Sequence, residues 1–162
     1  MMAASCCKMR QDEQHANYLN ASDREFVIAA LRHNDQELVA STVGADHSTY
    51  PPLTEFCDLM HLDAIRATDS LKSSLSGLDI VLPGNIDSTD YVTVQKVTLL
   101  SDKDFDSAFI QVEINIHHKM RWISQSEIDS GENKRVVGYA RTYLRTIEEH
   151  LRKLDSLYNS RE

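Results

Sequence analysis

Four ionisable residues stand among apolar residues on the predicted faces of long helices: Glu37, Asp63, His117 and His150. Acids and histidines are uncommon in a protein interior unless they have a partner there. Carboxylates and imidazoles are acceptable ligands for iron, manganese or zinc. They can equally hydrogen-bond to one another and hold helices in register. The pattern therefore predicts a polar cluster inside the fold, and its role is either metal binding or structural support.

The spacing of these residues favours the structural role. Di-iron centres in helical bundles use Glu-x-x-His on facing helices, and this sequence has no such motif. It carries instead Glu113 one helical turn before His117, which is a weaker signal. Neither a Ser/His/Asp spacing, a phosphate-binding loop nor an H-E-x-x-H motif is present, so no reaction is predicted. We expect a non-enzymatic binding or structural domain, with a metal-binding protein as the alternative. The remaining histidines outside the cluster are predicted at the surface or its boundary: His15, His33, His47 and His118.

Hydrophobic periodicity predicts four long amphipathic helices. They cover residues 22–43, 51–76, 101–130 and 133–158. Ser22 and Glu25 form a capping-box pattern at the start of the first helix, and Gly44 is its predicted end. The connections within the first pair and within the second pair are short, which indicates two antiparallel hairpins.

The segment 89–100 is ambiguous. Its β-branched residues favour a strand, but a single strand would have no pairing partner. We therefore expect a short extra helix between the second and third long helices. Residues 1–21 are predicted to be a disordered tail or the remnant of a lipoprotein signal, and residues 22–160 one domain. The expected fold is all-α, an antiparallel four-helix bundle.

Helix heights suggest how the polar residues meet. At a rise of about 1.5 Å per residue, Glu37, Asp63 and His117 fall near one level if the first and third long helices run in the same direction. On the same assumption, His150 is expected about two turns lower.

Composition limits the partners. The chain has 162 residues, 41% of them hydrophobic, which is enough for one domain with a core. Its net charge of -8 makes nucleic acid and anionic membrane surfaces poor partners. No apolar run approaches the roughly 20 residues of a transmembrane helix.

The three cysteines form neither a disulfide framework nor a CxxC metal site. Cys57 lies on an apolar stripe and is predicted to be a core residue. Cys6 follows Ala3-Ala4-Ser5, which is similar to the end of a bacterial lipoprotein signal. The apolar region that precedes the cysteine in such signals is absent, so either the signal is truncated or the match is chance. Cys6 is nevertheless the candidate site of lipid attachment.

Taken together, these motifs resemble a bacterial family of ferritin-like helical bundles, described as predicted secreted or outer-membrane proteins of unknown function. The resemblance covers residues 23–157. Residues that match the family's pattern are Asp23, Phe26, Glu37, Met60, Asp63, Ala67, Leu71, Leu82, Pro83, Phe105, Asp106, His117, Leu144 and His150. Two positions depart from it, since Ala64 replaces a histidine and Arg145 replaces a proline.

The resemblance implies a four-helix bundle, no assigned activity, and a location in the periplasm or outer membrane of a bacterium. A cytoplasmic location is the alternative. Ala64 weakens the case for a metal site, although His61, one turn earlier, is a possible substitute.

Overall fold

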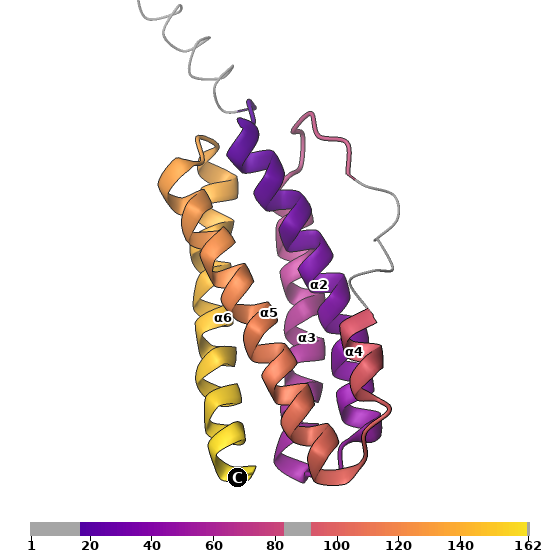
Figure 1. Ribbon diagram of the computed structural model, residues 1–162. Coiled ribbons are helices and arrows are strands. Elements are labelled where there is room, and N and C mark those ends of the chain that lie inside the picture. Colours follow the sequence, from indigo (N-terminus) through magenta and orange to yellow (C-terminus); the bar gives the residue numbers. More distant parts are fainter. Residues whose placement is uncertain (1–16, 83–91, 162) are drawn as a thin grey trace, which may run out of the picture.

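The computed structural model describes residues 17–82 and 92–161, and every element within them is helical (Figure 1). The helices are α2 (Ala21–His47), α3 (Pro51–Ser74), α4 (Val92–Val97), α5 (Asp102–Ser130) and α6 (Lys134–Arg161). The all-α prediction is confirmed for this part of the chain, including a short helix before α5. The predictions about Cys6, Cys7, His15, Pro83 and most of the N-terminal tail lie outside the described residues.

Helix α2 begins and ends differently from the prediction. Asn20 is the N-cap: its side chain accepts a hydrogen bond from the backbone of Asp23, and the Asp23 side chain accepts one from the backbone of Asn20. This reciprocal pair, rather than Ser22 and Glu25, forms the capping box. Gly44 does not end the helix, which continues to His47. Gly44 is buried instead, where α2 approaches Cys57 and Phe109 closely.

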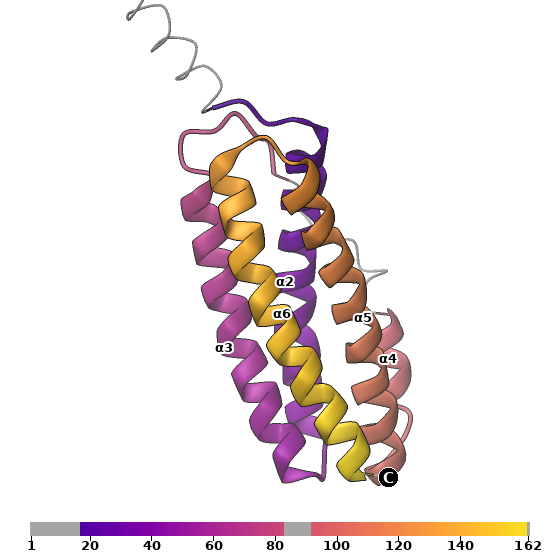
Figure 2. The same ribbon diagram turned by 90° about the vertical axis from the view of Figure 1, so that its left-hand side faces the viewer.

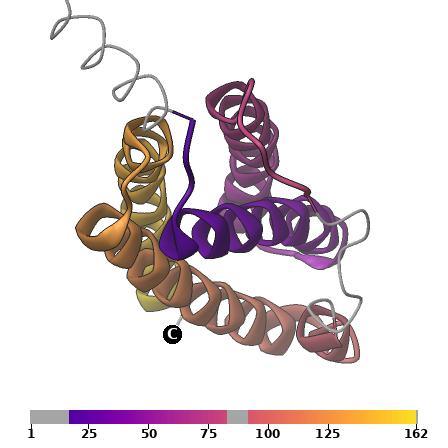
Figure 3. The same cartoon turned by 90° about the horizontal axis from the view of Figure 1, so that it is seen from above.

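The long helices form two hairpins that pack side by side. Helix α2 packs along α3 and α5 along α6, while α2 also contacts α5 and α3 contacts α6. Helices α2 and α6 run in one direction and α3 and α5 in the other (Figures 1 and 2). The assumption that the first and third long helices run the same way is therefore wrong. The chain between α3 and α5 must return along the length of the molecule, and α4 packs against α5 on the outside (Figure 3).

One continuous core joins the four long helices. Its largest fully buried apolar side chains are Phe26, Leu53, Met60, Leu71, Phe105, Phe109, Ile110, Ile147 and Leu154. Each such side chain stabilises the fold by roughly 1.5–3 kcal/mol through burial. Cys57 is buried in this core, as predicted. Of the helices described, none combines the length and hydropathy needed to cross a membrane.

Two helical glycines offer a test of this packing. An alanine Cβ at Gly44 would lie 2.5 Å from Cys57 Sγ and 2.6 Å from Phe109 Cζ, whereas a Cβ at Gly138 meets nothing within 4 Å. Replacing glycine by alanine in a helix stabilises it by about 0.5–1 kcal/mol, but overpacking costs about 1–3 kcal/mol. We expect Gly44→Ala to lower the free energy of unfolding and Gly138→Ala to raise it, as measured by urea denaturation. Equal effects of the two substitutions would contradict the close approach at Gly44.

Candidate functional site

A chain of hydrogen bonds crosses the middle of the core. Asp63 of α3 lies 3.2 Å (Oδ2) from His150 Nε2 of α6, and His150 Nδ1 lies 3.1 Å from His117 Nε2 of α5. His117 Nδ1 lies 2.9 Å from the backbone carbonyl of Glu113, one turn earlier. Glu37 of α2 reaches the same group, with its Oε2 3.8 Å from His117 Nε2. The structure thus brings together all four residues that the sequence singled out.

A second arm of the cluster comes from His33, which precedes Glu37 by one turn of α2. His33 Nε2 lies 3.7 Å from Glu37 Oε1. The other ring nitrogen, Nδ1, lies 2.7 Å from the hydroxyl of Tyr143 on α6. That hydroxyl donates to Asn34 Oδ1 at 2.5 Å. His33, Asn34 and Tyr143 are all buried.

These partners assign the proton on each imidazole. Because the Tyr143 hydroxyl donates its proton to Asn34, its oxygen accepts one from His33 Nδ1, and His33 Nε2 keeps a lone pair. The carbonyl of Glu113 can only accept, so His117 Nδ1 carries a proton and His117 Nε2 keeps a lone pair. The His33 lone pair lies 3.7 Å from the Glu37 carboxylate, whereas His117 Nε2 lies 3.1 Å from His150 Nδ1 and 3.8 Å from that carboxylate.

His33, Glu37 and His117 therefore form a compact set of donor atoms. One ligand atom from each lies within 4.8 Å of the others, and all three residues are buried. Four carboxylate oxygens and one nitrogen in this region have no hydrogen-bond partner among the described residues, namely both oxygens of Glu37, both of Glu113, and His33 Nε2. Buried polar atoms without partners are rare and costly. Either a bound proton or a cation would relieve this cost.

Burial controls the charges of the cluster. It raises the pKa of Glu37 well above its usual value, and the neighbouring Glu113 carboxyl adds to this effect. It also raises the pKa of Glu113 to about 7. In the opposite direction, burial lowers the pKa of His33 to about 3 and that of His117 well below its usual value. The imidazoles are thus neutral at neutral pH, which is the form that binds metals.

His150 is held differently. Burial lowers its pKa, while the hydrogen bond to Asp63 and the charge of that carboxylate act in the opposite direction. Three contacts connect Asp63, His150, His117 and the Glu113 carbonyl, and each needs one proton to be a hydrogen bond. Neutral His150 and His117 supply two protons between them. A cation bound to His117 Nε2 would replace the contact with His150 Nδ1, and the two remaining contacts need only two protons.

The structure corrects two predictions. His150 does not lie two turns below the group, since its Nδ1 lies 3.1 Å from His117 Nε2 across the α5–α6 pair. His33 is not at the surface, since only 6% of it is exposed. Its position one turn before Glu37, on the same helix face, was the signal that could have found it.

Two neighbouring positions bear on the family pattern. His61 does not join the cluster, and its Nδ1 lies 3.1 Å from the hydroxyl of Ser41. Ala64, the position of the missing histidine, lines a small void of about 10 Å³ that also borders His33, Glu37 and His150. The void is large enough for about one water molecule or ion.

These features define an all-helical domain with a polar centre. Residues 8–157 match the family described as Domain of unknown function (DUF4142), and the chain belongs to that family. The fold is similar to a crystal structure of a DUF305 fragment from Deinococcus radiodurans, with a TM-score of 0.76 and 14% sequence identity over 88% of this chain and 98% of that one. No curated protein matches the chain.

The raised pKa of Glu113 predicts a pH dependence of stability. Between the usual value of 4.5 and about 7, the folded protein binds more protons than the unfolded chain, so the free energy of unfolding falls as the pH rises. From pH 5 to pH 8, metal-free wild type should lose on the order of 1–3 kcal/mol more than Glu113→Gln. The histidine contributions are common to both proteins and cancel in the comparison. Urea denaturation at the two pH values measures this difference.

The matched control is Glu148→Gln, which changes an exposed acid on α6. This variant should follow the pH dependence of the wild type. If Glu113→Gln also follows it, Glu113 ionises without a burial penalty and the electrostatic description of the cluster is wrong.

Proposed function

We propose that the protein binds a divalent first-row transition metal ion in the core, through His33 Nε2, the Glu37 carboxylate and His117 Nε2. One observation carries this proposal: three buried lone-pair donors from two helices converge within 4.8 Å, and His33 Nε2 and both Glu37 oxygens have no hydrogen-bond partner among the described residues. Two imidazoles and a carboxylate suit iron, manganese or zinc. Three protein ligands also leave positions open for water or another ligand.

The surroundings of the three ligands support the proposal. Metal-bound histidines donate their second N–H to a carbonyl, carboxylate or other acceptor, which fixes the ring and its tautomer. His33 does so through Tyr143 and His117 through the Glu113 carbonyl. Glu113 adds a second buried carboxyl beside the site. A dication would offset the burial that raises the pKa of both acids, and the Glu113 charge that further raises the pKa of Glu37.

The structural network that the sequence favoured is the second candidate. The hydrogen bonds from Asp63 through His150 to His117 support it, because they link α3, α6 and α5. It leaves the carboxylates of Glu37 and Glu113 and the Nε2 atom of His33 without partners. A metal ion accounts for these atoms. It would replace the hydrogen bond from His150 to His117 Nε2 and leave the contacts of His150 with Asp63 and of His117 with the Glu113 carbonyl in place.

We further propose that the fold is an antiparallel four-helix bundle of the ferritin-like type. In such bundles a single long crossover joins the two hairpins, and metal ligands project into the core from facing helices. The opposite directions of neighbouring helices and the long return from α3 to α5 support this assignment. The DUF305 fragment, at 14% sequence identity, supports this assignment through its fold alone.

The metal proposal predicts the content of the purified protein. The full chain, purified without chelator, should contain about one iron, manganese or zinc ion by elemental analysis. Glu37→Gln and His117→Ala should lose it, whereas His118→Ala, an exposed neighbour on α5, should keep it. Adding the identified ion at about 100 times its dissociation constant should raise the free energy of unfolding by roughly 2.7 kcal/mol. Glu37→Gln is nearly isosteric, so a folded variant without metal separates ligand loss from unfolding.

A metal-free wild type that gains no stability from iron, manganese or zinc would contradict metal binding and favour the network. Metal retained by both Glu37→Gln and His117→Ala would locate the ion elsewhere.

The cell-envelope location, periplasm or outer membrane, remains a proposal that rests on the family resemblance and on Ala3-Ala4-Ser5-Cys6. We expect the native protein in the envelope fraction of a bacterial cell. Mass spectrometry of the N-terminus then reports whether Cys6 carries lipid. Recovery from the cytosol with an unprocessed N-terminus would contradict this location.

A further inference from the structure

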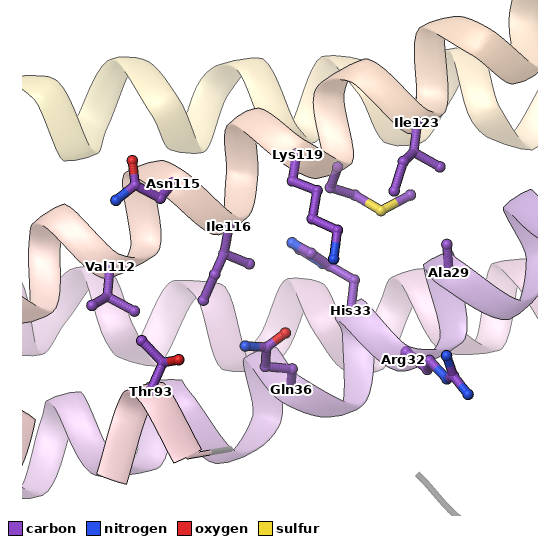
Figure 4. Close-up of a pocket in the computed structure, with 11 residues that line it drawn as sticks. Ala29, Arg32, His33, Gln36, Thr93, Val112, Asn115, Ile116, Lys119 and Ile123 are labelled. Carbon is purple, nitrogen blue, oxygen red and sulfur yellow. The ribbon is translucent and has the colours of Figure 1, made fainter. Parts of the chain in front are cut away.

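A pocket of about 460 Å³ opens between α2 and α5, next to the buried cluster. Its walls are one face of each helix, with spacings of three and four residues, and α4 closes one side with Thr93. Figure 4 shows the side chains of both helices directed into the space between them. The volume lies in the range of sites for small organic molecules, roughly 300–1,000 Å³.

The lining divides into an apolar wall and two cations. Val112, Ile116 and Ile123 of α5 supply apolar surface that continues into the core. Arg32 and Lys119 are the charged residues of the lining, which contains no acid. Within the described part of the chain, neither cation has an acidic partner. In a chain with 25 acidic and 17 basic residues, a pocket with positive charge alone favours an anion.

His33 forms the inner surface of this pocket. Lys119 extends from α5 toward the ring of His33, and Arg32 lies at one end (Figure 4). The opposite edge of the His33 ring faces Glu37. A molecule in the pocket would therefore sit against the ring that the cluster uses.

We propose that this pocket binds a small organic carboxylate, with its acidic group at Lys119 and Arg32 and its apolar part on Val112, Ile116 and Ile123. An inorganic anion would leave the apolar wall exposed to water, and a neutral or cationic molecule would leave the two cations without partners. Cations positioned over an apolar wall match a molecule with one anionic end. The proposal does not depend on metal binding, because none of its contacts requires an ion in the cluster.

The experiment uses the full chain after metal removal, so its result is separate from that of the metal analysis. Octanoate is the probe, octylamine the cation of matched length, and inorganic phosphate the anion without an apolar part. Isothermal titration calorimetry should detect octanoate binding and much weaker binding of the other two. Lys119→Glu and Arg32→Glu should each weaken octanoate binding by about tenfold or more, since each loses a charge-assisted contact.

Arg121→Glu is the matched control, because it makes the same charge change on the same helix at an exposed position outside the pocket lining. It should leave octanoate binding within about twofold of the wild type. Circular dichroism and urea denaturation establish that each variant is folded.

Absence of octanoate binding, or equal binding of octanoate and octylamine, would overturn the proposal. Equal binding of phosphate and octanoate would overturn the carboxylate assignment. Equal weakening by Arg121→Glu and Lys119→Glu would show that net charge, and not the pocket, governs binding.

Discussion

The carboxylate of Glu37 is the constraint on which the centre of this protein depends. Only 3% of Glu37 is exposed, and neither carboxylate oxygen has a hydrogen-bond partner among the described residues. An ionised carboxylate in an apolar interior is very costly unless it is neutralised or paired. A bound proton or a cation can meet this requirement. The neutral lone pairs of His33 and His117 beside it favour the cation, because they add ligands without adding charge.

Two other buried acids, Asp23 and Asp106, differ from Glu37 in having hydrogen-bond donors for their oxygens. Asp106 accepts hydrogen bonds from Ser48 and from Arg161, the last residue of α6. Asp23 accepts from the backbone of Asn20 and of Asn133. These acids join helix ends and have protein partners for their oxygens. Glu37 and Glu113, in the middle of the core, lack such partners.

Helix direction is what assembles the site. The return of the chain after α3 allows α3 and α5 to run the same way and sets α2 against α5 with opposite direction. His33 and Glu37 lie near the middle of α2, and Glu113 and His117 near the middle of α5. Residues near the midpoints of antiparallel neighbours meet whichever way one of them runs. For this reason the residues met although the predicted direction was wrong. The interface between α2 and α5 also forms, farther from the core, the pocket lined by Arg32 and Lys119.

The sequence by itself determined that the chain is helical and where its long helices lie. It also identified four polar residues on otherwise apolar helix faces, namely Glu37, Asp63, His117 and His150. Periodicity carries this information because one helix face repeats every 3.6 residues. It could not decide that Asn20 caps α2, that Gly44 lies inside that helix, or that His33 is buried. These depend on which helices are neighbours and how closely they approach. Only the tertiary structure brings the neutral nitrogens of His33 and His117 to one carboxylate. The tautomers are set by hydrogen bonds from His33 to Tyr143, which is distant in sequence, and from His117 to the backbone carbonyl of Glu113.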